Sequence, residues 1–196
     1  RILLPQAMMD PVAEAIAARL ATTRIGDPRL ETTRMGALVG QGQKADVMAR
    51  LAAFAGEVQP VFTGEALGIE AENPEAGAYL KPALYRCIDP DEATSVHEIE
   101  AFGPVATLMP YRDLSHAARL ANRGGGSLVL SVITHDPAVA RTMVHEAGPW
   151  HGRIYINDRD SMGEATGHGS PLPHMTHGGP GRAGGGEELG GIRGVM

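Results

Sequence analysis

Apolar residues recur at two spacings along the chain, and the two alternate. Helical spacing of every three or four residues predicts four amphipathic helices, over residues 10–22, 41–54, 113–122 and 136–148. Asp10-Pro11 and Asp136-Pro137 each place an N-cap aspartate before a proline, a common helix start. Asp113 is expected to cap the third helix, and Gly56 is expected just beyond the end of the second.

Short apolar runs between these helices predict strands, over residues 1–5, 58–63, 79–84, 105–111, 127–134 and 153–158. The run 127–134 is nearly continuous, which is typical of a strand buried on both faces. Because strands and helices alternate, the expected fold is α/β, with a mainly parallel sheet and helical crossovers. The acidic segment 64–77 is expected to be a surface loop, so no domain boundary is needed there.

The C-terminal part has a different composition. Residues 163–194 contain twelve glycines, which predicts a glycine-rich, irregular loop. Within it, residues 179–184 (GPGRAG) match the G-x-G-x-x-G pattern of dinucleotide-binding loops. However, no apolar strand precedes these residues and a poor helix former follows them, so the irregular loop is the preferred interpretation. His168, His174 and His177 offer imidazoles to a metal, but no cysteine or carboxylate is spaced to complete a site, and none is predicted.

Composition narrows the class of protein. With 43% apolar but only 4% aromatic residues, the core must be mainly aliphatic, which suits helices packed on a sheet. The net charge of −6 without a basic stripe argues against a nucleic-acid partner, and no apolar run is long enough to span a membrane. One cysteine, Cys87, excludes a disulfide framework within the chain. We therefore expect a cytoplasmic protein.

Two glutamates, Glu98 and Glu100, stand directly before Phe102-Gly103-Pro104. From spacing alone, the favoured interpretation is structural. The glutamates would then be solvent-facing charges ahead of a strand, Phe102 would belong to the core, and the Gly-Pro pair would make a turn.

Three motifs nevertheless resemble the aldehyde dehydrogenase superfamily. Residues 100–105 (EAFGPV) resemble its E-x-F-G-P-V element, residues 152–158 (GRIYIND) a late strand ending in Asn, and residues 184–191 (GGGEELGG) its S-G-x-G-R-E-x-G turn. The motifs occur in the family's order and spacing, and the resemblance covers essentially the whole chain. The sequence of residues 157–196 is most similar to the aldehyde dehydrogenase part of PaaZ-type bifunctional ring-opening enzymes of phenylacetate degradation. It is also similar to semialdehyde dehydrogenases of benzoyl-CoA breakdown.

The resemblance implies two cofactor-binding residues. By position, Glu100 accepts hydrogen bonds from the nicotinamide ribose of NAD or NADP, and Phe102 packs beside the nicotinamide. A carboxylate offers two acceptor oxygens to a vicinal diol, which suits this role. Gln43 aligns with a family position that reaches the cofactor, whereas Asp46 stands near the place of the family's lysine.

The resemblance also implies a reaction. Family members attack an aldehyde with a cysteine thiolate, transfer hydride to the nicotinamide, and hydrolyse the thioester to a carboxylic acid. The nucleophilic Cys, the general-base Glu and the dinucleotide-binding domain all precede the position of Arg1. Residues 1–196 are therefore expected to form a partial catalytic domain without a catalytic residue, inactive alone. Cys87 has no neighbour that would lower its pKa and is expected to be structural.

The implied substrate is a small-molecule aldehyde, a CoA-linked semialdehyde, and the implied assembly is a homo-oligomer. The glycine-rich loop is expected near the side from which the aldehyde enters. The alternative function is a non-catalytic oligomerisation or binding module derived from an aldehyde dehydrogenase, using exposed sheet edges.

Overall fold

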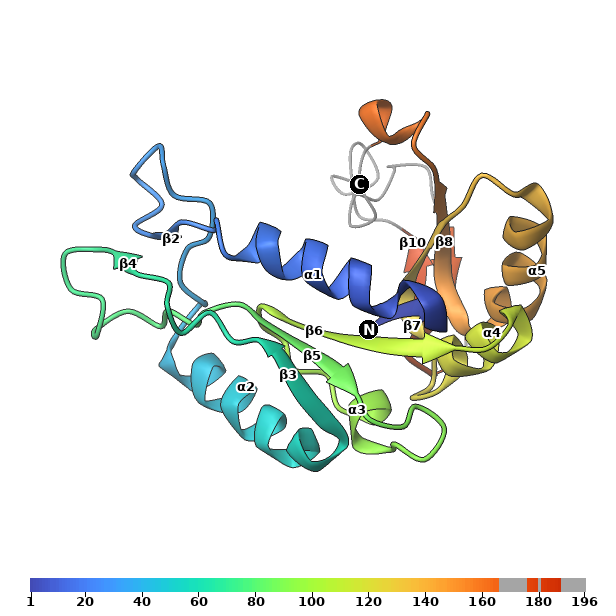
Figure 1. Ribbon diagram of the computed structural model, residues 1–196, viewed down its shortest axis with the longest axis horizontal. Helices are drawn as coiled ribbons and strands as arrows, with labels where there is room; N and C mark the ends of the chain where they lie inside the picture. Colours follow the sequence, from blue (N-terminus) through green and yellow to red (C-terminus); the bar gives the residue numbers. More distant parts are fainter. Residues whose placement is uncertain (166–175, 180, 188–196) are drawn as a thin grey trace. The chain divides into compact units, whose positions relative to one another are not determined.

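The structure, a computed structural model, describes residues 1–165, 176–179 and 181–187 (Figure 1). The chain divides into two compact units, residues 1–111 and 112–196. In both, helices alternate with strands that pair mostly in parallel. The predicted α/β class is therefore confirmed.

The first unit is built on a four-stranded sheet in the order β1-β6-β5-β3. Its strands are β1 (Ile2–Pro5), β6 (Val105–Tyr111), β5 (Ala83–Cys87) and β3 (Val58–Phe62). β6 pairs in parallel with both β1 and β5, whereas β3 pairs antiparallel with β5. The connection from β3 to β5 holds no helix, and such a connection returns the chain in the opposite direction. A separate parallel pair joins β2 (Ile25–Gly26) and β4 (Ile69–Glu70).

A helix covers each face of this sheet (Figure 1). On one face, α1 (Met9–Leu20) buries Met9 and Ala13 against Leu84 and Leu108. On the other, α2 (Gln41–Phe54) contributes Phe54 to a cluster with Val58, Cys87, Val96 and Met109. Leu108 and Met109 are neighbours in β6, and successive side chains of a strand point to opposite faces. The alternation in β6 therefore serves both cores.

Two predicted helix signals are wrong. Asp10 does not cap α1, because a 3₁₀ turn (Gln6–Met8) starts the helix early, and the Asp10 carboxylate instead pairs with the guanidinium of Arg86 on β5. Gly56 lies inside a second 3₁₀ turn (Ala55–Glu57) and has no positive φ, so it is not a left-handed helix terminator.

A short helix that sequence patterns did not predict, α3 (Ser95–Glu98), precedes the E-x-F-G-P-V motif. No local side chain caps it. Instead, the carboxylate of Glu57 accepts hydrogen bonds from the backbone N–H groups of Thr94 (3.2 Å), Ser95 (3.0 Å) and Val96 (2.8 Å). Burial raises the pKa of Glu57, but these backbone hydrogen bonds outweigh burial and hold it below its ordinary value. A carboxylate about forty residues away thus fixes the start of α3.

The second unit contains a strand–helix–strand element. β7 (Ser127–Ile133) and β8 (His151–Asn157) pair in parallel, and α5 (Pro137–Ala147) connects them. α4 (Leu114–Asn122) packs against α5. Both predicted caps are confirmed: Asp113 accepts from the His116 N–H (2.7 Å) and Asp136 from the Ala138 N–H (2.8 Å). The His116 ring returns a bond by accepting from the Arg112 N–H (3.1 Å).

The expectation that β7 is buried on both faces is wrong in this structure. Leu128 is 47% exposed and Ile133 is 68% exposed, while Val132 is buried. In the described residues β7 pairs only with β8, so its other edge has no neighbouring strand.

The described part of the glycine-rich segment is more regular than expected. β9 (Thr176–Gly178) and β10 (Gly185–Glu187) pair antiparallel, and a 3₁₀ turn (Gly181–Ala183) connects them. The Gly179 N–H donates to the Gly184 carbonyl (3.0 Å). Within this motif, Gly179 and residues 181–184 thus belong to a strand connection, and β10 follows them where a dinucleotide loop requires a helix. Residues 166–175, with His168 and His174, lie outside the described residues. Across residues 1–165 and the described parts that follow, no helix is long and apolar enough to cross a membrane.

Replacing Glu57 tests the long-range cap. In Glu57→Gln the side chain keeps one acceptor oxygen, but its NH₂ group cannot accept a hydrogen bond from the backbone N–H groups that start α3. The free energy of unfolding should therefore fall by about 1 kcal/mol at pH 7. The pKa of folded Glu57 lies below the ordinary 4.5, so the stabilisation is complete above that pH and is lost as pH falls through the folded pKa. Urea unfolding at several pH values should therefore show the two proteins converging in acid. An exposed control, Glu14→Gln, should change little; equal losses in both variants would refute the cap.

Replacing Gly126 tests the turn between α4 and β7. Gly126 has φ +78°, and a Cβ there would lie 1.8 Å from the carbonyl oxygen of Trp150. Gly126→Ala should lower the free energy of unfolding by at least about 2 kcal/mol, because it adds backbone strain to a steric clash. Gly148→Ala is the control, since its Cβ would meet only Ile154, at 3.7 Å. Thermal denaturation of both variants measures the difference, and similar melting temperatures would contradict the assigned turn.

Candidate functional site

The candidate site is the segment between α3 and β6, residues 99–104. Glu100 is exposed, and Phe102 exposes 69% of its surface although it is a large apolar residue. The prediction from spacing that Phe102 belongs to the core is wrong. The segment is tightly turned, because the Gly103 N–H donates to the Ala101 carbonyl and the Val105 N–H donates to the Gly103 carbonyl, both at 2.7 Å.

Side chains of α2 hold the backbone of this segment. The Gln43 amide donates through Nε2 to the carbonyl oxygen of Phe102 (2.9 Å), and Arg50 donates through Nη1 to that of Glu100 (3.3 Å). Between them, both methyl groups of Val47 pack against Gly103, where an added Cβ would approach them to 3.0 and 3.1 Å. Gln43, Val47 and Arg50 lie on one face of the helix because they are four and three residues apart. The carbonyls face α2, and the side chains of Glu100 and Phe102 are exposed.

Arg1, directly before β1, joins the start of this sheet to α3. Arg1 donates through Nη1 to Nδ1 of the buried His97 (2.8 Å), whose Nε2 contacts the carbonyl oxygen of Pro90 (2.9 Å). His97 is on α3, so these contacts link α3 to the start of β1. Among the described residues, no hydrogen bond engages the carboxylate of Glu100.

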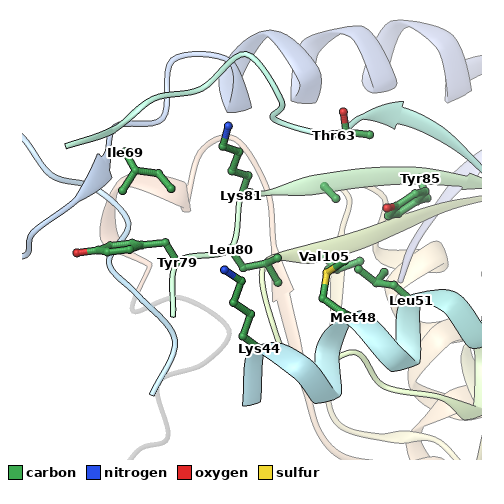
Figure 2. Close-up of a pocket in the computed structure, with 11 residues that line it drawn as sticks. Lys44, Met48, Leu51, Thr63, Ile69, Tyr79, Leu80, Lys81, Tyr85 and Val105 are labelled. Atoms are coloured by element: carbon green, nitrogen blue, oxygen red, sulfur yellow. The ribbon is translucent and has the colours of Figure 1, made fainter. Parts of the chain in front are cut away.

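A pocket of about 400 Å³ opens along the neighbouring face of α2. Figure 2 shows the side chains of Lys44, Met48 and Leu51 along the helix, opposite Leu80 and Val105. Tyr79, Lys81 and Tyr85 line it as well, and Nζ of Lys81 donates to the carbonyl oxygen of Glu65 (2.8 Å). The pocket includes neither Glu100 nor Phe102, so α2 has one face toward the candidate site and another toward this pocket.

The turn after β8 in the second unit gathers several polar side chains. Oδ1 of Asn157 accepts from the Asp158 N–H (2.8 Å) and from the hydroxyl of Ser161 (2.5 Å), so Asn157 holds this turn. Hydrogen bonds from Ser161 lower the pKa of Asp158, burial opposes them, and the charge of His135 adds to the lowering. Sequence patterns missed Ser161, although an Asn-Asp pair followed by Ser is typical of a side-chain-bonded turn.

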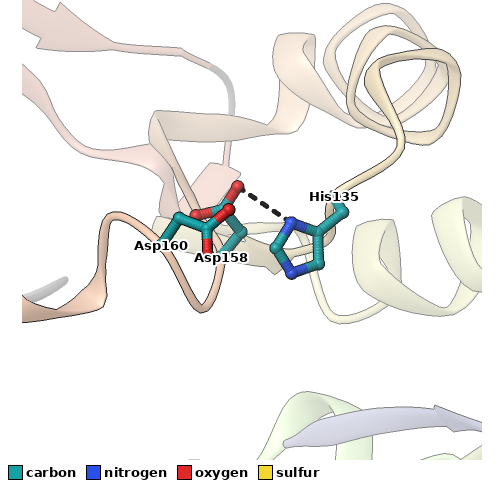
Figure 3. Close-up of side chains that lie close together, drawn as sticks. All are labelled: His135, Asp158 and Asp160. Atoms are coloured by element: carbon teal, nitrogen blue, oxygen red, sulfur yellow. Dashed lines mark ion pairs between the residues drawn. The ribbon is translucent and has the colours of Figure 1, made fainter.

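His135 and Asp160 complete this cluster (Figure 3). Nδ1 of His135 lies 3.2 Å from Oδ2 of Asp158, and one ligand atom from each of His135, Asp158 and Asp160 lies within 4.8 Å of the others. His135 and Asp160 are exposed and Asp158 is half-buried, the cluster supplies three ligands, and the ion pair and turn account for its geometry. We assign it a structural role.

The structure also places the other residues that were singled out from the sequence. Cys87 is 2% exposed, inside the hydrophobic cluster under α2, which agrees with a structural cysteine. Asp46 accepts from Nε of Arg50 (2.7 Å). Glu98 ends α3 and is exposed. The cofactor roles of Glu100 and Phe102 remain predictions.

Comparison with known proteins shows the family of this chain. Residues 1–194 match the aldehyde dehydrogenase family. The chain is 53% identical over 164 residues to protein MaoC of Klebsiella aerogenes, covering 82% of this chain and 47% of that protein. It is 38% identical over 182 residues to the 3,4-dehydroadipyl-CoA semialdehyde dehydrogenase of Aromatoleum evansii, covering 92% and 35%.

Solved structures show the same fold. Betaine aldehyde dehydrogenase of Staphylococcus aureus, solved in complex with NAD⁺, superposes with a TM-score of 0.80 at 22% identity, over 98% of this chain and 36% of that one. The chain spans between a third and a half of the length of the two curated relatives above. From its match over residues 1–194, the chain belongs to the aldehyde dehydrogenase family.

Proposed function

We propose that the full-length protein oxidises a CoA-linked semialdehyde to its carboxylic acid with NAD⁺ or NADP⁺, as a step in aromatic-compound (phenylacetate) degradation. Family membership supports aldehyde oxidation. The name of the Aromatoleum relative supports the CoA-linked semialdehyde as the kind of substrate. The cofactor proposal is supported by the NAD⁺ bound in a structural neighbour.

One observation carries the cofactor proposal to particular residues. The backbone from Glu100 to Phe102 is held by α2, while the carboxylate of Glu100 and the ring of Phe102 are both exposed. An exposed aromatic ring on a rigid backbone is a ready contact for a flat ring that carries positive charge, and an exposed carboxylate suits a vicinal diol. These residues fit a nicotinamide and its ribose.

In this proposal Glu100 accepts hydrogen bonds from the ribose hydroxyls, and Phe102 restricts where the nicotinamide can lie. When bound, the cofactor supplies the hydride acceptor for the oxidation. From the family resemblance we expect the nucleophilic cysteine and the general base outside residues 1–196, and the single cysteine of this chain, Cys87, is buried in the hydrophobic cluster under α2.

Two further features of the proposal concern the whole protein. We expect a cytoplasmic homo-oligomer, and the exposed Leu128 and Ile133 of β7 are apolar surface that a partner segment or subunit would cover. The same observation favours the alternative function, a non-catalytic oligomerisation or binding module. Activity of the full-length protein separates the two.

Replacing Glu100 in the full-length protein tests the cofactor role. Glu100→Gln keeps the size of the side chain but removes a charged acceptor, so the Kd for NAD(P)⁺ should rise about tenfold. Glu98→Gln, two residues earlier, is the matched control and should bind as the wild type does. The measurements are calorimetric titration with each cofactor and initial rates with a CoA-linked semialdehyde. Equal effects of the two substitutions would reject the assignment, and a wild type inert toward aldehydes would favour the binding module.

Residues 1–196 alone should oxidise no aldehyde. The resemblance places the nucleophile outside this range, and the buried Cys87 cannot reach a substrate. The same rate assay on the isolated chain, with the full-length protein as the positive control, measures this. Turnover by the isolated chain that Cys87→Ser abolishes would show the placement of the nucleophile to be wrong.

A further inference from the structure

Gln43 has its amide committed within the protein. Its Oε1 accepts from the Val39 N–H (3.1 Å), ahead of the first residue of α2, and its Nε2 donates to the carbonyl oxygen of Phe102 (2.9 Å). The two bonds fix which end of the amide faces Phe102, because a flipped amide would set oxygen against oxygen. Gln43 thus joins the start of α2 to the candidate site.

Arg50 makes the second backbone contact, with help from Asp46. Nε of Arg50 donates to Asp46 (2.7 Å), one helical turn earlier, and Nη1 donates to the carbonyl oxygen of Glu100 (3.3 Å). The pair is about half exposed, with 44% of the Arg50 side chain and 50% of the Asp46 side chain accessible, so solvent weakens it. Between the two contacts, Gln43 makes the shorter one.

From this geometry we propose that Gln43 is a positioning residue, assisted by the Asp46–Arg50 pair. It aims Glu100 and Phe102 at the cofactor by holding their backbone and does not bind the cofactor itself. This inference rests on the proposed function. It differs from the role that family resemblance gives to position 43, because the amide is already bonded at both ends.

Val47 and Gly103 explain why a contact to a carbonyl is effective here. A Cβ at Gly103 would approach the Val47 methyl groups to 3.0 and 3.1 Å, so the turn lies close against the helix. The carbonyl oxygens of Glu100 and Phe102, which precede Gly103, face α2 and accept hydrogen bonds from Arg50 and Gln43. Losing the Gln43 bond would let the Phe102 peptide rotate, and the Phe102 ring would move with it.

The test is Gln43→Glu in the full-length protein, with Gln41→Glu as the matched control. Gln41 lies on the same helix, undergoes the same change of charge, and donates to the Ala76 carbonyl (3.2 Å). A glutamate at position 43 can still accept from Val39 but repels the Phe102 carbonyl. The Kd for NAD(P)⁺ should rise about fivefold in Gln43→Glu and stay unchanged in Gln41→Glu. Arg50→Lys, which cannot bridge Asp46 and Glu100, should raise it about twofold.

A coupling experiment separates positioning from direct contact. The double variant Glu100→Gln, Phe102→Ala lacks both side chains that Gln43 is proposed to position. Adding Gln43→Glu to it should therefore change the Kd for NAD(P)⁺ by less than about twofold. The same fivefold loss in that background would mean that Gln43 touches the cofactor, and would overturn the proposal.

Amide hydrogen exchange without cofactor tests the backbone contact by itself. Peptides spanning residues 99–106 should exchange faster in Gln43→Glu than in the wild type, while those from α1 stay unchanged. Unchanged exchange in 99–106 would overturn the positioning role. Failure of the wild type to bind either cofactor would overturn the proposed function along with it, whereas normal binding by Gln43→Glu would overturn only the positioning role.

Discussion

The backbone of residues 94–103 is fixed by side chains from other elements, and the candidate site depends on this constraint. Glu57 binds its amide groups at one end, and Gln43 and Arg50 bind its carbonyls at the other. Val96 anchors the segment in the core, but the side chains of Glu100 and Phe102 are exposed, so the order around these two residues comes from hydrogen bonds to their backbone. In this arrangement the polar backbone groups form hydrogen bonds within the protein, while the carboxylate of Glu100 and the ring of Phe102 stay accessible to a ligand.

α2 is the element on which both ends of this arrangement converge. It presents Gln43, Val47 and Arg50 to the segment, and it leads directly into the 3₁₀ turn that carries Glu57. Its other anchor is Phe54, buried against Val58 and Met109 under the sheet. The position of the site is therefore tied to the hydrophobic core through one helix, so a core substitution that shifts α2 should also shift Glu100 and Phe102.

The sequence allowed good predictions wherever the deciding contact is local. Asp113 and Asp136 were correctly assigned as caps, because each bonds an N–H two or three residues away. The same signal failed at Asp10, where Arg86 from another strand takes the carboxylate. α3 could not be predicted, because its cap comes from Glu57. Burial of β7 was overestimated because an apolar run records what a strand can bury and not which segments are present to cover it.

The same distinction explains what was learned about the site. Spacing alone treated Glu98 and Glu100 alike, and only resemblance to a family separated them. The structure gives a physical reason for the difference. Glu98 closes α3, where the Ile99 N–H still bonds back to Ser95 (2.7 Å), whereas Glu100 follows in non-helical backbone whose carbonyl is held by Arg50. Two residues separate a carboxylate at the end of a helix from one on backbone that α2 holds, and a pattern of charges along a sequence cannot record that difference.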